Sequence, residues 1–441
     1  MAQEEDKRIV AGLDIGTTKI VAIIGSINEH DKLEILGMAR TESLGVARGV
    51  VRQITQTTEA IERVMKEVQE IAGYEVNFLN VGIAGQHIRS VQHSGSRMRE
   101  DIDVEISQKD INQLTESMYQ LVMLPGEKVI DVLPQDFTVD NDKGITDPIG
   151  MAGVRLEANF HIITGNIAAA KNIVKCVEGA GMEVENLILE PLASADSVLS
   201  AEEKEAGVVL VDIGGGTTDV AIFKEGIIRH TAVIPFGGNI ITDDIKHGCS
   251  IVKNQAEQLK VKFGSALAEM ASSNEIVSIP GIRGRAPKEI SMVNLAAIIE
   301  ARMGEIIDQV YYEIQNSGLE KQLIAGIVVT GGGAQLNNIT QFFEFLTGMD
   351  TRVGYPTEHI GSGLEDVTSP MYSTAVGLIL KGFEKYKISE SYTDSENGKS
   401  NIPEENQEAT ADKVSGTSKF LDWVKSTTEN ITDSVFGDLT D

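Results

Sequence analysis

The sequence predicts an α/β protein made of two related halves, and three observations support this class. The motif Leu-Asp-Ile-Gly-Thr-Thr-Lys at 13–19 returns as Val-Asp-Ile-Gly-Gly-Gly-Thr-Thr-Asp at 211–219, which indicates a duplication. In each copy one apolar run precedes the turn and another follows it, a pattern typical of a strand hairpin. Aromatic residues are only 5% of the chain, so we expect cores of aliphatic side chains in helices and parallel strands.

The first half opens with strands and continues into a long helix. Its expected elements are a third strand at 33–40, a helix at 51–72 with apolar residues at helical spacing, and a strand at 77–83. Residues 85–162 interrupt this order and predict an inserted subdomain with its own helix near 109–122. The first lobe is therefore expected to comprise 1–84 and 163–205, with 370–386 returning to it.

The second half repeats this plan from residue 206 onward. The second lobe is predicted from 206–226 and 301–369, and 227–300 is expected to be a subdomain grafted onto it. Its expected elements are helices at 253–263, 291–316 and 371–383 and a strand at 326–330. A chain of 441 residues has room for such a division, since one domain per ~150 residues is usual.

The end of the chain changes in composition. Residues 387–418 carry almost no large apolar side chains, so they are expected to form a disordered linker. Residues 419–441 regain apolar side chains at helical positions, which predicts a short amphipathic membrane-targeting helix. Its predicted membrane-binding residues are Phe420, Leu421, Trp423, Val424, Ile431 and Val435.

Charge and composition exclude several classes of partner and location. The formal net charge of −28 repels phosphate backbones, so no nucleic-acid partner is expected. Cys176 and Cys249 are the two cysteines, and without partners at metal-ligand spacing they indicate a reducing cytosol. The charged start of the chain predicts no secretion signal, and no apolar run approaches the ~20 residues of a membrane-spanning helix. Any membrane contact is expected to be peripheral.

The two repeated turns have the residue types needed to hold a nucleotide triphosphate. Glycine lets backbone N–H groups approach phosphate oxygens, threonine hydroxyls add donors, and Asp14 and Asp212 can hold hydrated Mg²⁺. A single turn of this kind is a common hairpin device, but two copies favour a nucleotide between two halves. The residues expected to bind are Asp14, Gly16, Thr17, Thr18 and Lys19 in the first turn and Asp212, Gly214, Gly215, Gly216, Thr217 and Thr218 in the second.

A third glycine cluster, Gly331, Gly332 and Gly333, ends another apolar strand. It resembles the adenosine motif of the superfamily of actin, sugar kinases and heat-shock chaperones, whose two phosphate motifs the repeated turns resemble in the same order. This resemblance implies a two-lobed actin-like fold of duplicated ribonuclease-H-like domains, with ATP and Mg²⁺ in the interlobe cleft. The alternative is that the three clusters are structural turns.

Three smaller matches to the superfamily add candidate residues. Glu257 and Lys260 resemble a Glu-x-x-Lys helix that reaches the ribose, although taken alone they are better explained as an exposed helical ion pair. Gly237 and Gly238 lie where the superfamily has a glycine turn near the phosphates. Glu190 opens a segment resembling the one that positions the attacking water, and a catalytic role and an ordinary helix-capping role both remain open.

Within the superfamily the chain resembles the FtsA family of bacterial cell-division proteins. The motifs at 12–19 and 211–219, the inserted segment and the C-terminal amphipathic helix carry this resemblance. It implies a protein that binds ATP, polymerises and docks the tail of FtsZ at the cytoplasmic face of the inner membrane, at the division septum. It also implies recruitment of later division proteins, and a scaffold role with at most weak ATPase activity.

Two further features bear on this resemblance, of which the first is a match and the second a departure. Glu300 and Arg302 match an Ile-Glu-x-Arg stretch at the family's FtsZ-binding surface, although a solvated helix face explains them equally. The family's terminal helix is commonly basic, whereas acids outnumber lysines at 419–441 here. The alternatives are a pilus-type actin-like ATPase resembling PilM or an ATP-dependent kinase of the same superfamily.

Overall fold

The computed structural model describes residues 8–30, 32–99, 104–281, 286–362 and 365–397. The first lobe is built on a six-stranded sheet in the order β11-β6-β1-β2-β3-β19. Its strands are β1 (Ile9–Ile15), β2 (Lys19–Ile27), β3 (Leu33–Glu42), β6 (Phe78–Ile83), β11 (Glu183–Leu189) and β19 (Ile360–Ser362). The helices α1 (Ile54–Ala72) and α3 (Ile167–Gly179) pack against this sheet, and a two-stranded hairpin of β4 (Val46–Ala47) and β5 (Val50–Val51) lies beside them.

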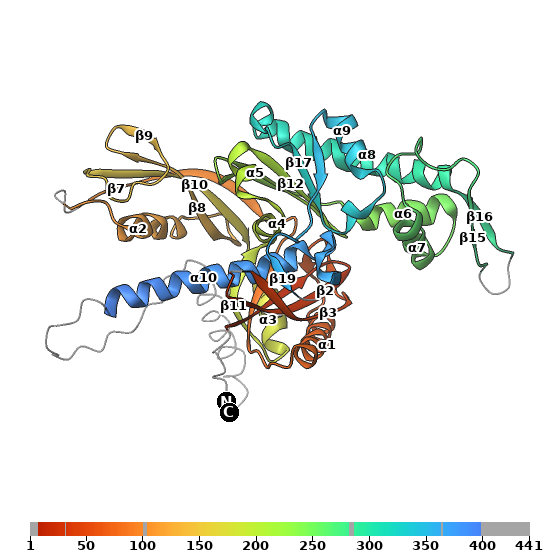
Figure 1. Ribbon diagram of the computed structural model, residues 1–441, viewed down its shortest axis with the longest axis horizontal. Helices are drawn as coiled ribbons and strands as arrows, with labels where there is room; N and C mark the ends of the chain where they lie inside the picture. The colour runs from red at the N-terminus through yellow and green to blue at the C-terminus, as the bar shows by residue number, and fades with distance from the viewer. Residues whose placement is uncertain (1–7, 31, 100–103, 282–285, 363–364, 398–441) are drawn as a thin grey trace.

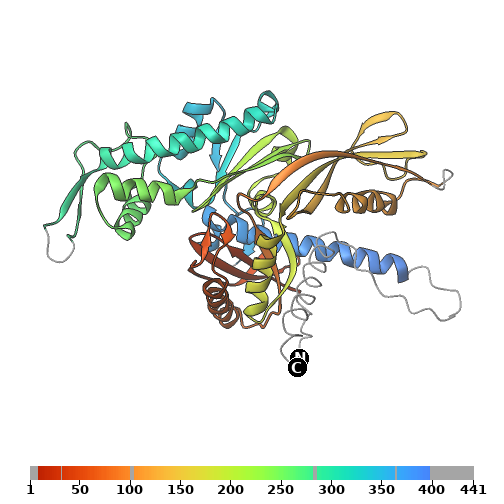
Figure 2. The ribbon, with the colours of Figure 1, turned by 180° about the vertical axis from the view of Figure 1, so that it is seen from behind.

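The second lobe has a five-stranded sheet in the order β14-β13-β12-β17-β18. Its strands are β12 (Val208–Ile213), β13 (Thr218–Lys224), β14 (Ile227–Ile234), β17 (Ile327–Thr330) and β18 (Thr351–Val353). The helices α5 (Ala201–Ala206), α8 (Met292–Asn316) and α9 (Ile339–Thr347) pack against it, and Figure 2 shows α8 running along the lobe. The central strands β12 and β17 consist mostly of buried aliphatic residues, as expected for strands covered on both faces.

The two sheets share one topology, which confirms the predicted duplication. In each lobe a central strand pairs antiparallel with the next strand and parallel with a later one, as β1 does with β2 and β6. β12 does the same with β13 and β17. The predicted α/β architecture of two related lobes is therefore present.

An inserted subdomain projects from the first lobe, as the sequence predicts (Figure 1). It contains α2 (Gln108–Tyr119) and a sheet in the order β7-β10-β8-β9 with its own hydrophobic core. The strands are β7 (Arg89–Met98), β8 (Glu127–Val139), β9 (Asp142–Ile145) and β10 (Arg155–Asn166). The sequence predicts the helix but not this sheet, and β10 runs past the expected boundary at residue 163.

A second arm extends from the other lobe (Figure 1). It contains α6 (Gly238–Cys249), α7 (Lys253–Phe263) and a hairpin of β15 (Ile276–Ile279) and β16 (Lys288–Ser291), packed on α8. The predicted start of this subdomain at residue 227 differs from the structure, because β14 pairs with β13 in the main sheet. β14, which follows residue 226, is therefore the third strand of a meander in the main sheet and not the start of the arm.

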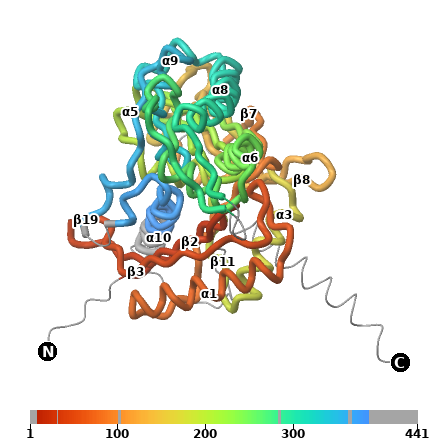
Figure 3. Tube along the Cα trace, turned by 90° about the vertical axis from the view of Figure 1, so that its right-hand side faces the viewer, coloured from red at the N-terminus to blue at the C-terminus, as the bar shows by residue number. Residues whose placement is uncertain are grey.

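Two helices lie between the lobes and join them. α4 (Glu190–Val198) contacts strands of both sheets, and α10 (Ser373–Asn397) packs on α4 and on β1, β2 and β6. Figure 3 shows α10 between the sheet of the first lobe and the second lobe. Gly377 lets α10 approach α4 closely, since a Cβ there would overlap the backbone of Ala193.

The helix α10 continues to Asn397, beyond the predicted linker boundary at 387. The rest of the predicted linker, 398–418, and the predicted terminal helix, 419–441, lie outside the described residues. No helix in the part of the chain that the structure describes is long and apolar enough to cross a membrane.

Candidate functional site

The two repeated turns are hairpin loops of equal length. In the first hairpin Ile15 pairs with Ile20, which leaves four residues, Gly16 to Lys19, between the paired positions, although Lys19 already pairs with β3 as the first residue of β2. In the second hairpin Ile213 pairs with Thr218, so the loop is Gly214 to Thr217. Because the second copy has two extra glycines, Thr218 lies in β13 while Thr18 lies within a loop.

The two loops face each other at the junction of the lobes. A Cβ at Gly215 would collide with the Thr18 side chain, and a Cβ at Gly216 would lie 2.6 Å from Thr17 Oγ1. The first loop therefore presents hydroxyl side chains and the second presents bare backbone. Thr17 Oγ1 also accepts a hydrogen bond from Gly49 N at 3.1 Å, which places the turn between β4 and β5 against the first loop.

Four carboxyl groups gather beside these loops. Burial raises the pKa of Asp14 to about 6, with a lowering contribution from Lys19 and a raising one from Asp212. Burial also raises the pKa of Asp212, and that of Asp219 to about 8. The pKa of Glu190 is raised well above its usual value by burial and by the charges of the three aspartates. A concentration of carboxyl groups with raised pKa values is typical of a functional site.

Short hydrogen bonds hold two of the charged groups in place. Asp212 Oδ2 accepts from Ser194 Oγ of α4 at 2.8 Å and from Thr374 Oγ1 of α10 at 3.2 Å. Lys19 Nζ donates to the Met371 carbonyl oxygen at 2.6 Å, and burial lowers the pKa of this lysine to about 8. The two helices between the lobes are thus bonded directly to Asp212 in β12, two residues before the second loop.

The structure brings the other predicted glycine turns to the second hairpin. Gly331 has φ +81° and packs so closely on Asp212 and Ile213 that only glycine fits there. Gly332 has open space around it, and Gly333 packs on the side chain of Ile213. Gly238 N donates to the Gly214 carbonyl oxygen at 2.9 Å, so the turn at 237–238 also borders the second loop.

Glu257 and Lys260 form more than an exposed ion pair. Lys260 Nζ lies 2.8 Å from Glu257 Oε2 and donates to the Gly238 carbonyl oxygen at 2.9 Å and to Thr242 Oγ1 at 2.8 Å. The lysine side chain is only 12% exposed, and burial lowers its pKa. This network ties α7 to the start of α6 beside the glycine turn, and a role at the ribose stays a prediction.

Glu190 begins α4 and lies half-buried beside the end of β6. Its side chain lies against Gly82, where a Cβ would be 3.0 Å from Glu190 Oε1. Glu190 therefore opens the helix and also lies close enough to the three aspartates for their charges to raise its pKa, so the structure is compatible with both interpretations from the sequence.

Sequence reasoning missed several residues of this site. Asp219 ends the second motif but was not among the expected ligands, although its place directly after two threonines in a strand was a usable signal. Its Oδ1 atom is buried without a hydrogen-bond partner among the described residues. Ser194 lies within the segment that begins at Glu190, whereas nothing in the local sequence points to Thr374.

The carboxylates do not form a ready-made metal cage. Among the residues that the structure describes, no group of three or more His, Cys, Asp or Glu side chains is arranged to hold a metal ion directly. A buried carboxylate oxygen without a partner still fits a hydrated cation, because water molecules can bridge the remaining distance. The donor set of carboxylates and hydroxyls also matches the oxygen ligands that Mg²⁺ prefers.

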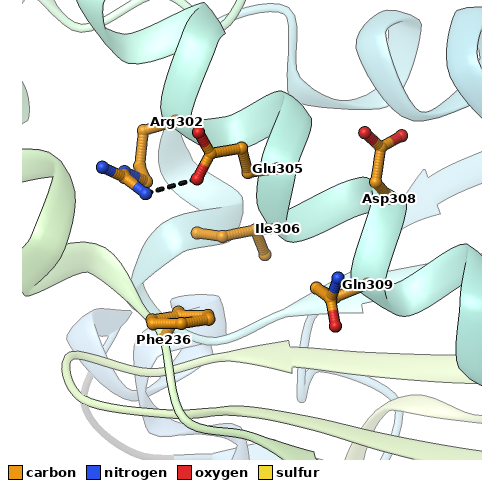
Figure 4. A pocket seen from close by; sticks show the side chains of 6 residues that line it. All are labelled: Phe236, Arg302, Glu305, Ile306, Asp308 and Gln309. Carbon is orange, nitrogen blue, oxygen red and sulfur yellow. Dashed lines mark hydrogen bonds and ion pairs between the residues drawn. The ribbon is translucent and has the colours of Figure 1, made fainter.

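A pocket of about 280 Å³ lies next to α8 (Figure 4). It is lined by Phe236, Arg302, Glu305, Ile306, Asp308 and Gln309. Arg302 Nε donates to Asp244 Oδ2 at 2.6 Å, and the same guanidinium pairs with Glu305. Glu300 accepts a hydrogen bond from Ala268 N, so this carboxylate serves partly to hold the loop before β15. A role of Glu300 and Arg302 in partner binding stays a prediction.

The fold and the paired turns together define a class. Solved structures with the same fold include a chain of the PilM-PilN type IV pilus biogenesis complex, with TM-score 0.63 and 14% identity over 85% of this chain and 98% of that one. Another is MreB5 of Spiroplasma citri bound to ADP, with TM-score 0.50 and 17% identity over 89% of this chain and 99% of that one. The protein has an actin-like fold with an inserted subdomain.

Sequence comparisons narrow this class to one family. Residues 209–377 match the family described as "Cell division protein FtsA", and 85–164 match "SHS2 domain inserted in FTSA". FtsA of Pseudomonas aeruginosa is 41% identical over 87% of this chain and 92% of its own length. FtsA of Escherichia coli is 34% identical over 88% of this chain and 93% of its own length. The chain belongs to the FtsA family of cell-division proteins, which confirms the resemblance seen in the sequence.

Proposed function

We propose that this protein binds ATP at the junction of its lobes and uses the bound state to act as an actin-like scaffold of cell division. One observation carries the nucleotide assignment: two glycine-threonine loops, one from each lobe, meet beside four carboxyl groups, two of them buried and two half-buried. A triphosphate between the loops would receive hydroxyl donors from Thr17 and Thr18 and backbone N–H donors from residues 214–216.

The remaining site residues suit the other parts of the ligand. Asp14 and Asp212 would hold Mg²⁺ through water, with Asp219 as a further carboxylate. The open position at Gly332 suits a flat base against the backbone, and Lys260 and Glu257 lie beside the glycine turn on the ribose side. Glu190 would position the attacking water, and bound Mg²⁺ would supply charge neutralisation to the phosphates.

The scaffold role follows from the family and from the end of the chain. We propose that the protein polymerises, binds the FtsZ tail at the surface around Arg302 and recruits later division proteins. The helix predicted at 419–441 would attach it to the cytoplasmic face of the inner membrane at the septum. Because acids outnumber lysines there, the apolar face must supply the attachment, and many copies in a polymer must share it.

Calorimetric titration of the purified protein with ATP tests the nucleotide assignment. We expect saturable binding that Mg²⁺ strengthens at least about tenfold, because the buried carboxylates repel an uncompensated triphosphate. No saturable binding at millimolar ATP, with or without Mg²⁺, would exclude the site.

Binding of an FtsZ tail peptide tests the partner surface. Arg302→Glu is expected to weaken the peptide at least about fivefold, since it reverses a charge beside the pocket. Arg63→Glu makes the same charge change at an exposed position of α1 and is expected to leave peptide binding unchanged. Equal affinities of the two variants would remove Arg302 from the surface.

Cosedimentation with anionic liposomes tests the membrane anchor. Truncation after Ser418 and Trp423→Asp are each expected to release the protein from the liposomes while ATP binding persists. Added salt should weaken attachment little, because apolar burial and not charge carries it. Retention after truncation would show that another segment holds the membrane.

A further inference from the structure

Phe236 connects the pocket beside α8 to the glycine turn at the second hairpin. It is the middle residue of the short link between β14, which ends at Ile234, and α6, which begins at Gly238. Its side chain is 37% exposed and lines the pocket, whereas Gly237 and Gly238 directly after it are buried. One short segment therefore has its side chain in one site and its backbone beside the other.

The pocket has room for a large apolar side chain next to the Phe236 ring. Its volume is about 280 Å³, and a cavity of about 150 Å³ already holds a benzene ring. Figure 4 shows Phe236 across from α8, which supplies the other five lining residues. Of these five, Ile306 is fully buried and the others are polar, so Phe236 supplies the accessible apolar side chain of the pocket. A peptide that inserts an apolar side chain here would cover the exposed part of the ring.

The backbone of the same segment is bonded to the second hairpin. The Phe236 carbonyl oxygen accepts a hydrogen bond from Thr218 Oγ1 at 2.9 Å. Three residues later, Asn239 N donates to the Gly215 carbonyl oxygen at 2.8 Å. A Cβ at Gly237 would lie only 2.6 Å from a carbonyl oxygen of the loop, so the segment and the loop are packed in direct contact.

A second connection runs from the pocket through α6. Arg302, which lines the pocket, donates from Nε to Asp244 Oδ2 of α6 at 2.6 Å. This helix begins at the glycine turn, and its Thr242 accepts a hydrogen bond from Lys260 Nζ. Two residues that line the pocket, Phe236 and Arg302, are thus joined to elements that border the second loop.

We propose that a peptide side chain in this pocket and a nucleotide at the second loop are coupled through Phe236, so that each strengthens the binding of the other. The inference rests on the ATP site and the partner surface proposed above, and it adds the regulation of one by the other. A side chain packed on Phe236 restricts the segment whose backbone contacts the loop, and a nucleotide that fixes the loop restricts the same segment. The ligand that binds second therefore loses less conformational entropy on binding.

Two titrations of the full chain measure this coupling. An FtsZ tail peptide is titrated with and without saturating Mg²⁺-ATP, and Mg²⁺-ATP is titrated with and without saturating peptide. We expect each ligand to raise the affinity of the other about fivefold, and the two factors must agree because coupling between binding sites is reciprocal. Phe236→Ala is expected to weaken the peptide and to bring both factors below about 1.5. Each factor is a ratio within one variant, so a partly inactive preparation gives the same factor.

Two control variants separate the Phe236 ring from the rest of the surface. Asp308→Asn removes the charge of another lining residue, on the exposed side of α8, and is expected to keep a factor of about five even where the peptide affinity itself changes. Phe345→Ala removes a ring of α9 that is 78% exposed, and it is expected to change neither the affinities nor the factor.

The outcomes separate this inference from the proposed function. If the unmodified protein binds ATP and the peptide but neither ligand affects the other, the inference is wrong while the proposed function stands. If the coupling factor of Phe236→Ala equals that of the unmodified protein, the coupling does not pass through this ring and the inference is again wrong. A protein that fails to bind one of the two ligands would contradict that part of the proposed function, and the inference with it.

Discussion

The two repeated hairpins have the same backbone and opposite surfaces. Each loop spans four residues, yet the first places Thr17 and Thr18 at its tip and the second places glycine there. The glycines of the second loop receive the threonines of the first, so the two copies fit together as unlike halves. The two copies thus share a fold element but present different surfaces, and we expect them to contribute different donors to the proposed nucleotide site.

The two hairpins also differ in their charged residues. Lys19 lies close enough to Asp14 to lower its pKa, which partly offsets the effect of burial. In β13, Asp219 instead adds a carboxyl group beside Asp212. The pairing of strands equates Asp219 with Val21 of the first copy, so the second hairpin has two paired acids, a buried one and a half-buried one, where the first has a single acid. We therefore expect the second hairpin to depend more strongly on a cation.

The largest expected effect comes from filling the bare loop. Gly215→Val is expected to reduce ATP affinity at least about hundredfold, because its side chain would collide with Thr18 and block backbone approach to the phosphates. Isothermal titration measures this loss, and circular dichroism checks that the variant folds. A folded Gly215→Val protein with unchanged ATP affinity would refute the assignment of the two loops.

The next effect concerns the acid that the first hairpin lacks. Asp219→Asn is expected to reduce the benefit of Mg²⁺ for ATP binding about tenfold, since one ionisable ligand of the hydrated cation is lost. Asp14→Asn provides the matched change in the other hairpin and should act in the same direction. Equal ATP affinity with and without Mg²⁺ in the unmodified protein would contradict both expectations.

Asp219 should also lower the stability of the ligand-free protein at high pH. Burial raises its pKa from 3.8 to about 8, so its ionisation costs more in the folded than in the unfolded protein. The stability that the protonated carboxyl contributes is full at about pH 4 and is lost as the pH rises toward 8. Asp219→Asn should therefore raise the melting temperature by about 3–8 °C at pH 8 and leave it nearly unchanged at pH 4.

Much of this site was predictable because its parts are short motifs at strand ends. The turns at Asp14, Asp212 and Gly331 are local signals, and the duplicated sheets bring them together without further information. Thr374 was not predictable, since its bond to Asp212 depends on α10 returning between the lobes from a distant part of the chain. The sheet of the inserted subdomain was missed because β7 is largely exposed and lacks a continuous apolar pattern.

The domain boundaries likewise depend on contacts between distant parts of the chain, which local sequence patterns do not reveal. The strand at 227–234 follows a hairpin turn, and only its pairing with β13 assigns it to the main sheet of the second lobe. Likewise α8 belongs to both the lobe and the arm, because its 25 residues extend along both. Sequence patterns predict such helices and strands well, but they do not determine which other elements these pair with or pack against.

A smaller effect is expected at the acid between the hairpins. Glu190→Gln is expected to lower ATP turnover about tenfold while ATP affinity changes less than threefold, because the side chain faces the site without belonging to either loop. A phosphate-release assay and a binding titration measure the two quantities separately. Loss of binding together with turnover would instead indicate a structural role at the start of α4.

The smallest expected effect comes from variants that test whether the threonine side chain of the first loop packs against the glycine backbone of the second. Gly215→Ala adds one Cβ whose nearest neighbours are three side-chain atoms of Thr18, and it is expected to weaken ATP about fivefold. Thr18→Ala removes the two nearest of those atoms at the cost of one hydroxyl donor, so alone it should weaken ATP a few-fold. If the loops are complementary, the double variant should bind ATP no more weakly than Gly215→Ala alone, because the second change relieves the first. Fully additive losses in this double-mutant cycle would mean that the two positions act independently, and the facing arrangement of the hairpins would then not govern nucleotide binding.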